Sequence, residues 1–496
     1  MRGRRERPNI LWYCTDQQRY DTIGALGNAH IHTPHLDALC GQGVAFANAY
    51  CQSPVCTPSR ASFLTGRYPA SNHVHRNGNE YFPSWETLVT KLLADEGYDC
   101  GLVGKLHLSR SQVLERRPPE DGYRYFKWSH HPNPDYPEGH DYAIWLKQEK
   151  GVDPYELYGK LRGSIGPGVP AYLHQTTWCS EMAVRFITEK REGPWLLSVN
   201  PFDPHPPFDP PQEYLDRYNL ATLPMPLFRE SDIEQQRAFR EIDMQTREAI
   251  NPYKAKELAD TVGEIPRGDM GFIPPIAYDP QLVKACYYAM IELIDDQFQV
   301  LVDALKATGQ YENTIMIFTS DHGEMLGDHG LIYKGCRFFE ALTHVPLVIS
   351  WPAKGLQGKL SEALVELVDI APTLLEAAGS TVPYFMHGKS LLPLLTGGQD
   401  LGWHKHYVTS EYHGAIGGAQ MPDQTHGVMY YDGRYKVCVY ENHEVGEIYD
   451  LVEDPGEFTN LWNEKAFSTE KVRLLHAAFR RYMGTSDAGS RRTHEY

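Results

Sequence analysis

The segment Cys51–Arg67 combines residue types that can perform nucleophilic chemistry on an anionic substrate. Its loop ends at Thr57-Pro58, and because proline is favoured at the first position of a helix, a helix is predicted to begin at Pro58. The free backbone N–H groups at such a helix start attract anions, and Arg60 adds a guanidinium group further along. Cys56 would lie at this positive end, where the pKa of a thiol is lowered and the sulfur can act as a nucleophile. From these residues alone, a buried structural cysteine beside a helix cap is an equally good interpretation.

Two pairs of potential metal ligands follow apolar stretches that are predicted to be buried strands. They are Asp16 with Gln17 after residues 9–14, and Asp321 with His322 after residues 314–319. Ligands of open α/β sheets collect at the carboxyl ends of the strands, so the two pairs could meet there. Carboxylate, amide and imidazole groups suit a divalent metal ion. For Asp16 by itself, a turn or a helix cap is the simpler interpretation.

Three further basic side chains stand at the ends of predicted strands. Lys105 and His107 follow residues 99–104, and alternation in an extended segment would place both on the same side. They would suit an oxyanion pocket, with an ordinary surface pair as the alternative. His205 follows residues 195–200 and is flanked by prolines, which favours a preorganised imidazole suited to proton transfer. A packed loop histidine is the alternative here.

The elements that must position these residues indicate an α/β protein with a large domain and a smaller one. The chain has 496 residues and 42% hydrophobic content, enough for a sizeable core. Glycines at 397–398 mark a predicted boundary between residues 1–398 and 399–496. The second part is predicted to hold short antiparallel strands closed by a helix from about residue 469 to 482.

Two weakly patterned segments, residues 109–175 and 209–275, are predicted to be loop-rich insertions of the large domain. Such loops often carry substrate specificity. In the first of them, a pocket could be lined by Trp128, His130, His131 and His140, although surface wrapping is the simpler interpretation.

The bulk composition excludes several classes of partner. A formal net charge of −17 argues against nucleic acid or an anionic membrane. No stretch approaches the roughly 18 apolar residues of a membrane span, and the apolar run Ile10–Tyr13 is too short for a signal-peptide core. Nine scattered cysteines without close CxxC pairs indicate reduced thiols. A cytoplasmic protein is therefore predicted.

The segment Cys56-Thr57-Pro58-Ser59-Arg60 resembles the C-x-P-x-R signature of type I sulfatases of the alkaline phosphatase superfamily, and Ser62–Arg67 resembles the tail that follows it. The related phosphonate monoester hydrolases carry the same pattern. The resemblance implies a large mixed β-sheet sandwiched by helices, with a smaller C-terminal α+β subdomain built on an antiparallel sheet. It also implies that a formylglycine-generating maturation enzyme oxidises Cys56 to formylglycine, whose hydrated gem-diol attacks sulfur.

The resemblance also assigns roles to residues that match the family's motifs in order along the chain. One divalent ion, expected to be Ca²⁺ with Mn²⁺ or Mg²⁺ as alternatives, would be bound by Asp16, Gln17, Cys56 as formylglycine, Asp321 and His322. The sulfate oxygens would be bound by Arg60, Lys105 and Lys334. His205 would protonate the leaving alcohol, and His107 would accept the proton that collapses the sulfated intermediate. The family usually carries Asp-Asp at the first pair, so Asp16-Gln17 has one negative charge fewer, which should weaken calcium binding or shift the preference among hard ions.

Three functions are open at this point. Lys105-x-His107 and the compact Cys56 signature favour a hydrolase of small-molecule sulfate esters. Asp16-Gln17 favours a phosphonate monoester or phosphate diester hydrolase with the same machinery, and one enzyme could act on both substrate classes. A remote alternative is a non-catalytic binding protein in which Cys56 stays a thiol. The sequence does not identify the alcohol part of the substrate, and it leaves a homo-oligomer open.

Overall fold

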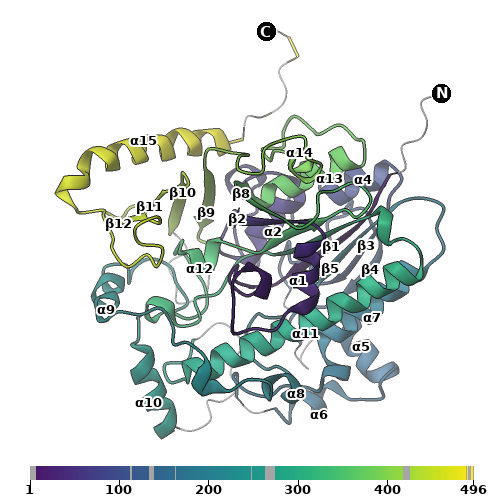
Figure 1. Cartoon of the computed structure of the whole chain (residues 1–496), viewed down its shortest axis with the longest axis horizontal. Coiled ribbons are helices and arrows are strands. Elements are labelled where there is room, and N and C mark those ends of the chain that lie inside the picture. The colour runs from purple at the N-terminus through teal and green to yellow at the C-terminus, as the bar shows by residue number, and fades with distance from the viewer. Residues whose placement is uncertain are drawn as a thin grey trace.

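An eight-stranded mixed sheet forms the centre of the molecule, with the strand order β4-β3-β5-β1-β6-β7-β2-β8 (Figure 1). The structure is a computed structural model that describes residues 7–111, 114–132, 139–161, 163–246, 248–262, 274–416, 425–487, 489 and 493–494. The strands of the large sheet are β1 (Asn9–Thr15), β2 (Val44–Tyr50), β3 (Asp99–Gly104), β4 (Tyr123–Trp128), β5 (Trp195–Asn200), β6 (Thr314–Ser320), β7 (Leu347–Ser350) and β8 (Lys359–Glu366). Neighbouring strands pair in parallel, except that β7 runs antiparallel to both β6 and β2.

Helices cover both faces of this sheet (Figure 1). The helices are α1 (Pro34–Gly41), α2 (Cys56–Thr65), α3 (Pro69–Asn72), α4 (Val89–Asp95), α5 (Asp141–Gln148), α6 (Pro154–Tyr158), α7 (Gln175–Thr188), α8 (Gln212–Leu215), α9 (Glu230–Arg237), α10 (Pro252–Val262), α11 (Pro280–Ala307), α12 (Glu340–Thr343), α13 (Ile370–Ala377), α14 (Leu392–Leu395) and α15 (Ser468–Thr485). Along β1, Ile10 and Trp12 point into a core shared with α2, α4 and α13. Leu11 and Tyr13 point into a second core shared with α1, α7 and α11. Because both faces of β1 are buried, its sequence is a continuous apolar run. The predicted large sheet between helices is confirmed.

The register between β1 and β6 places the ends of these two strands side by side. Their pairing runs from Asn9 opposite Thr314 to Thr15 opposite Ser320. The residues that follow directly are Asp16 and Asp321, and the backbone N–H of Asp321 donates to the carbonyl of Thr15 at 3.3 Å. Two segments that are distant in the chain therefore deliver their carboxylates to the same sheet edge.

The C-terminal part forms a separate four-stranded antiparallel sheet, in the order β12-β11-β10-β9 (Figure 1, yellow-green to yellow). Its strands are β9 (Val408–His413), β10 (His426–Tyr431), β11 (Tyr435–Tyr440) and β12 (Gly446–Asp450). Leu474 and Ala478 of α15 pack on its outer face. Its other face shares a hydrophobic cluster with Tyr50 and Val55 of the large part. The predicted C-terminal α+β unit is confirmed, while the boundary at residue 398 stays a prediction.

Several sequence expectations about local structure were wrong or incomplete. Helix α2 begins at Cys56 and not at Pro58, which is its third residue. The segment 109–175, expected to be loop-rich, contributes β4 to the edge of the large sheet and also contains α5 and α6. Segment 209–275 contains α8, α9 and α10, although residues 263–273 lie outside the described part. Among the described helices, none combines the length and the apolar character needed to cross a membrane.

Candidate active site

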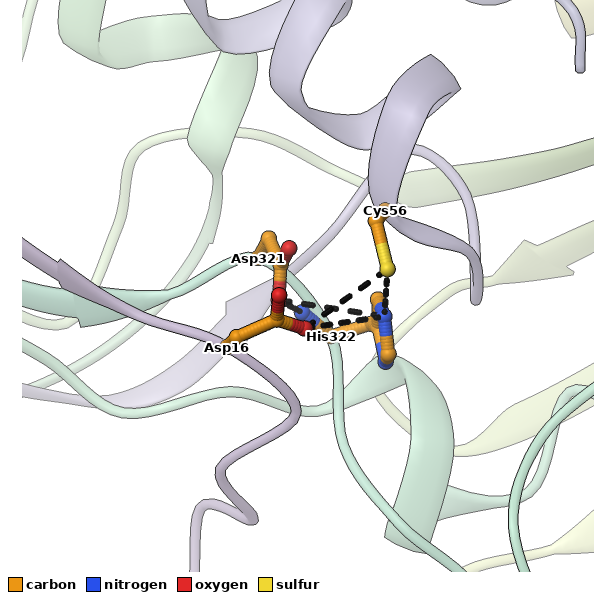
Figure 2. Close-up of side chains that lie close together, drawn as sticks. All are labelled: Asp16, Cys56, Asp321 and His322. Carbon is orange, nitrogen blue, oxygen red and sulfur yellow. Dashed lines mark hydrogen bonds and ion pairs between the residues drawn. The ribbon is translucent and has the colours of Figure 1, made fainter. Parts of the chain in front are cut away.

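Four potential metal ligands from three distant segments meet at the carboxyl edge of the large sheet. Asp16 follows β1, Asp321 and His322 follow β6, and Cys56 is the first residue of α2 (Figure 2). One ligand atom from each lies within 4.8 Å of those of the other three, and all four residues are buried. The Cys56 Sγ is 3.6 Å from Asp16 Oδ1 and 3.1 Å from His322 Nε2. The sequence prediction that these residues meet is therefore matched by their positions.

Helix α2 is held so that Cys56 stands at its amino end. All ten of its residues are buried. The N–H of Thr57 is capped by the Asn77 side chain at 3.0 Å. Gly66 ends the helix with a φ of 69°, and a Cβ at this glycine would lie 2.9 Å from Met386 Cγ. Asn77 thus helps to position the start of the helix.

Arg60 links the two carboxylates of the site. Its Nε donates to Asp321 Oδ2 at 2.8 Å, and its Nη2 lies 3.7 Å from Asp16 Oδ2. Its Nη1 donates to the carbonyl of Lys105 at 3.1 Å. The guanidinium is fully buried, so its charge acts on both carboxylates at low dielectric. Direct binding of a sulfate oxygen by Arg60 stays a prediction.

Lys105 forms a buried ion pair with Asp16. Burial by itself would raise the pKa of Asp16, but the cations Lys105 and Arg60 hold it well below its usual range. Asp16 is therefore a carboxylate at neutral pH, as a metal ligand must be.

Lys334 brings a second ammonium group to the site, directly beside the cysteine. Its Nζ lies 2.6 Å from Gln17 Oε1, 3.1 Å from Cys56 Sγ and 3.4 Å from His322 Nε2. Burial and Asp16 act to raise the pKa of Cys56, but Lys105, Lys334 and His322 outweigh them and lower it from 9.0 to about 7. The sulfur therefore sits in a strongly cationic pocket.

His322 presents Nε2 to this pocket because its other ring nitrogen is engaged. Nδ1 lies 2.9 Å from the carbonyl of Gly323, which can only accept, so this nitrogen carries the proton. Nε2 then faces Cys56 and is the ring nitrogen that can serve as a metal ligand. A ring oriented in this way is typical of metal-binding histidines.

His107 lies in the site, but not for the predicted reason. Its φ of 56° is left-handed, so the expected extended alternation from Lys105 to His107 is wrong. The backbone turns here because Glu115 accepts from the N–H groups of His107 and Leu108, at 2.7 and 2.5 Å. Burial, and after it Lys105, lower the pKa of His107 well below its usual value, so the imidazole is neutral.

His205 is half-buried at the edge of the site. Its Nδ1 lies 2.7 Å from the carbonyl of Pro206, and its ring packs against Phe202 at 4.5 Å between centroids. Burial, and then Lys334, lower the pKa of His205 well below its usual value. The ring is thus oriented by the proline segment, with Nε2 left for proton transfer.

The four pocket candidates of the first insertion divide into two pairs. His130 packs against His107 at 4.6 Å between ring centroids, and its Nδ1 lies 3.0 Å from Nδ1 of His131. Both rings also lie near Phe202. His140 accepts from the backbone N–H of His130, while Trp128 donates to Glu115. The first pair borders the site, and the second pair supports the fold around it.

Two supporting residues were not singled out from the sequence. Glu324, in the segment Asp321-His322-Gly323-Glu324, accepts a hydrogen bond from the Gln17 amide. Glu115 shapes the turn at His107. Glu324 could have been noticed, because it belongs to the same strand-end motif as two expected ligands. Glu115 lies in a weakly patterned segment that offers no such signal.

Known proteins match this chain along most of its length. Residues 8–380 match the family model described as Sulfatase, and residues 327–481 match the one described as N-sulphoglucosamine sulphohydrolase, C-terminal. An arylsulfatase of Clostridium perfringens (strain 13 / Type A) is 30% identical over 484 residues, which cover 95% of this chain and 93% of the relative. The phosphonate monoester hydrolase of Agrobacterium radiobacter has a similar structure, with a TM-score of 0.78, 25% identity and coverage of 97% of this chain and 96% of the other. The phosphonate monoester hydrolase SpPMH from Silicibacter pomeroyi gives a TM-score of 0.79 at 25% identity, with the same coverages.

The chain therefore belongs to the sulfatase family of the alkaline phosphatase superfamily. Its class is that of the sulfuric ester hydrolases, as the sequence motifs indicated.

Proposed function

We propose that this protein hydrolyses small-molecule sulfate esters through a formylglycine made from Cys56 and one divalent metal ion. The environment of Cys56 supports this best. All nine cysteines are free and buried, and burial raises the pKa of the other eight. Only at Cys56 do neighbouring cations outweigh burial. A structural cysteine needs no such surroundings.

The donor set fits a hard divalent ion once oxygen replaces the sulfur. Asp16 and Asp321 offer carboxylates, His322 offers Nε2, and Gln17 offers an amide oxygen. The Cys56 sulfur is a soft ligand, whereas the hydroxyl oxygen of a hydrated formylglycine is hard. When bound, the ion would polarise a sulfate oxygen and the attacking hydroxyl.

In the attack step, one hydroxyl of the hydrated formylglycine forms a bond to sulfur, and the bond from sulfur to the alcohol oxygen breaks. Asp321 takes the proton of the attacking hydroxyl. Lys334 lies beside position 56 and Lys105 is paired with Asp16, and both ammonium groups can neutralise charge that develops on the sulfate oxygens. His205 gives its Nε2 proton to the departing alcohol. The negative charge of a bound sulfate ester favours the protonated imidazole that this step requires.

In the release step, His107 takes the proton of the remaining hydroxyl. The bond from carbon to the sulfate oxygen breaks, sulfate leaves, and the aldehyde forms again. A neutral imidazole can accept this proton, which agrees with the lowered pKa of His107. Elimination avoids an attack of water on the crowded sulfur centre.

Conversion of Cys56 is tested by mass analysis of the peptide that carries it, from protein produced together with a formylglycine-generating enzyme. We expect an aldehyde at position 56 and turnover of at least one ester in a panel of aryl, sugar, choline and alkyl sulfates. Full sulfatase turnover by protein in which Cys56 is entirely a thiol would contradict the proposal.

Phosphonate monoesters are the second candidate substrates. The Asp16-Gln17 pair supports them, and so does the likeness over nearly the whole chain to two phosphonate monoester hydrolases. Both substrate classes present a tetrahedral anion to the same cationic pocket. The ratio of kcat/KM for matched aryl sulfate and aryl phosphonate esters separates the two, and a ratio in favour of the phosphonate would overturn the sulfatase assignment.

A further inference from the structure

The side-chain amide of Gln17 is held at both ends. Its Nε2 donates to a carboxylate oxygen of Glu324, and its Oε1 accepts from Lys334 Nζ at 2.6 Å. A carboxylate can only accept and an ammonium group can only donate, so the amide cannot turn over without losing both bonds. The same Lys334 Nζ lies 3.1 Å from Cys56 Sγ. The oxygen end of Gln17 therefore faces the predicted metal site.

The backbone of Gln17 is equally constrained. Its φ of 67° lies in the left-handed region, which costs a residue with a side chain free energy unless its surroundings hold it there. Its N–H donates to Asp321 Oδ1 at 3.0 Å, and its carbonyl accepts from the Tyr287 hydroxyl at 2.6 Å. These bonds fix the backbone of Gln17 and therefore the direction in which its side chain leaves the backbone.

Glu324 is a rigid acceptor for this amide. It is fully buried, and its Oε1 accepts from the N–H groups of Leu326 and Tyr333, at 3.0 and 2.5 Å. Its Oε2 is the atom that faces Gln17. Within the described part of the chain, Gln17 is the only side chain hydrogen-bonded to this carboxylate. Glu324 is therefore connected to the site through the Gln17 amide, and its carboxylate fixes the orientation of that amide.

We propose that Glu324 is a positioning residue, which aims the amide oxygen of Gln17 at the metal site and so allows a neutral amide to serve as a ligand there. This inference rests on the proposed function, since it assumes that a divalent ion binds beside Asp16. Glu324 acts through Gln17 and touches neither ion nor substrate. Removal of such an outer partner typically weakens metal binding by about 10–100-fold.

Three isosteric variants isolate this effect. In Glu324→Gln, the N–H groups of Leu326 and Tyr333 would donate to the oxygen of the new amide. The NH₂ group of this amide would then face Gln17. The Gln17 amide must then turn over and point NH₂ at the site. In Gln17→Glu, two carboxylates face each other. The double variant Q17E/E324Q restores the hydrogen bond with donor and acceptor exchanged, and a carboxylate oxygen again faces the site.

The readout is binding of Ca²⁺ or Mn²⁺ alone to the full chain, measured by calorimetric titration and by the shift in the midpoint of thermal unfolding. We expect Glu324→Gln to bind the ion about 10–100-fold more weakly, and the double variant to bind at least as tightly as the unaltered protein. Glu447→Gln makes the same chemical change at a buried carboxylate of β12 and should leave the affinity unchanged.

Wild-type affinity in Glu324→Gln would overturn the inference, and so would a double variant that binds the ion as weakly as Glu324→Gln. If Glu324→Gln does not fold, the double variant is compared with the unaltered protein, and a weaker affinity of the double variant would overturn the inference. Absence of any ion-dependent effect in the unaltered protein would instead overturn the metal site of the proposed function. The two failures are therefore distinguishable.

Discussion

The ammonium group of Lys334 lies 3.1 Å from the sulfur of Cys56, although the two residues are 278 positions apart in the chain. The contact joins the start of α2 to the loop that follows β6. It places a fixed positive charge at the atom that is proposed to become the nucleophile. The protonation of this sulfur before its conversion should therefore depend on Lys334.

The first prediction concerns the pKa of the unconverted thiol. Lys334→Gln should raise the pKa of Cys56 above about 7, because one of the cations that outweigh burial is removed. The pKa is depressed on folding from its value of 9.0, so the thiolate contributes stability at high pH that is lost as the pH falls through about 7. Titration of thiolate absorbance, relative to the Cys56→Ala protein, measures the change. Lys91→Gln, at a surface ion pair, is the control, and an unaltered midpoint in Lys334→Gln would refute the assignment.

Cys56→Ala should abolish sulfate ester turnover, because no formylglycine can form at position 56. We expect a loss of at least about 10³-fold in kcat, as for removal of other enzyme nucleophiles. Circular dichroism and the thermal midpoint should change little, since the substitution removes a single atom. A variant that keeps full turnover would rule out the proposed mechanism.

His107→Asn should separate the attack step from the release step. Without the base, the sulfated intermediate cannot collapse, so kcat should fall by about 10²–10⁴-fold. The first equivalent of alcohol should still appear as a burst. Mass analysis of quenched protein should then find sulfate attached at position 56. Loss of turnover with neither burst nor adduct would argue against this role of His107.

Gly66→Ala should destabilise the protein more than Gly151→Ala does. Both glycines have left-handed backbones, with φ of 69° and 67°, so both variants carry a strain of about 1–2 kcal/mol. Only at Gly66 would the new Cβ also meet Met386, at 2.9 Å, whereas nothing lies within 4 Å at Gly151. Urea unfolding of the two variants measures the difference. If both variants lose the same free energy of unfolding, the end of α2 must relax away from Met386.

Strands buried on both faces were the part of the fold that the sequence predicted best. Residues 9–14 and 314–319 are continuous apolar runs, and they match β1 and β6 to within one residue. The edge strands β4 and β8 were missed, because each mixes charged with apolar residues and one side of it has no partner strand. An apolar pattern records burial and not strand pairing, so edge strands are hard to recognise.

The candidate site was predictable in its residue types but not in its detailed contacts. Pro58 suggested the start of α2, yet a proline is tolerated anywhere in the first turn, where no N–H is needed for an intrahelical bond. The left-handed turn at His107 depends on a carboxylate eight positions away, and no local pattern encodes it. Likewise, the amide orientation of Gln17 depends on Glu324, 307 positions away.

Because β1 pairs in register with β6, the site cannot form until the chain has been synthesised at least as far as Lys334. Thr15 and Ser320 are 305 positions apart, so a ribosome-bound chain has no ion-binding centre until most of the protein has emerged. A shift of one residue between the two strands would turn alternate side chains to the wrong face and separate the paired carboxylates. Hydrolytic activity would then report on correct assembly of the entire sheet, and truncated products would be chemically inert.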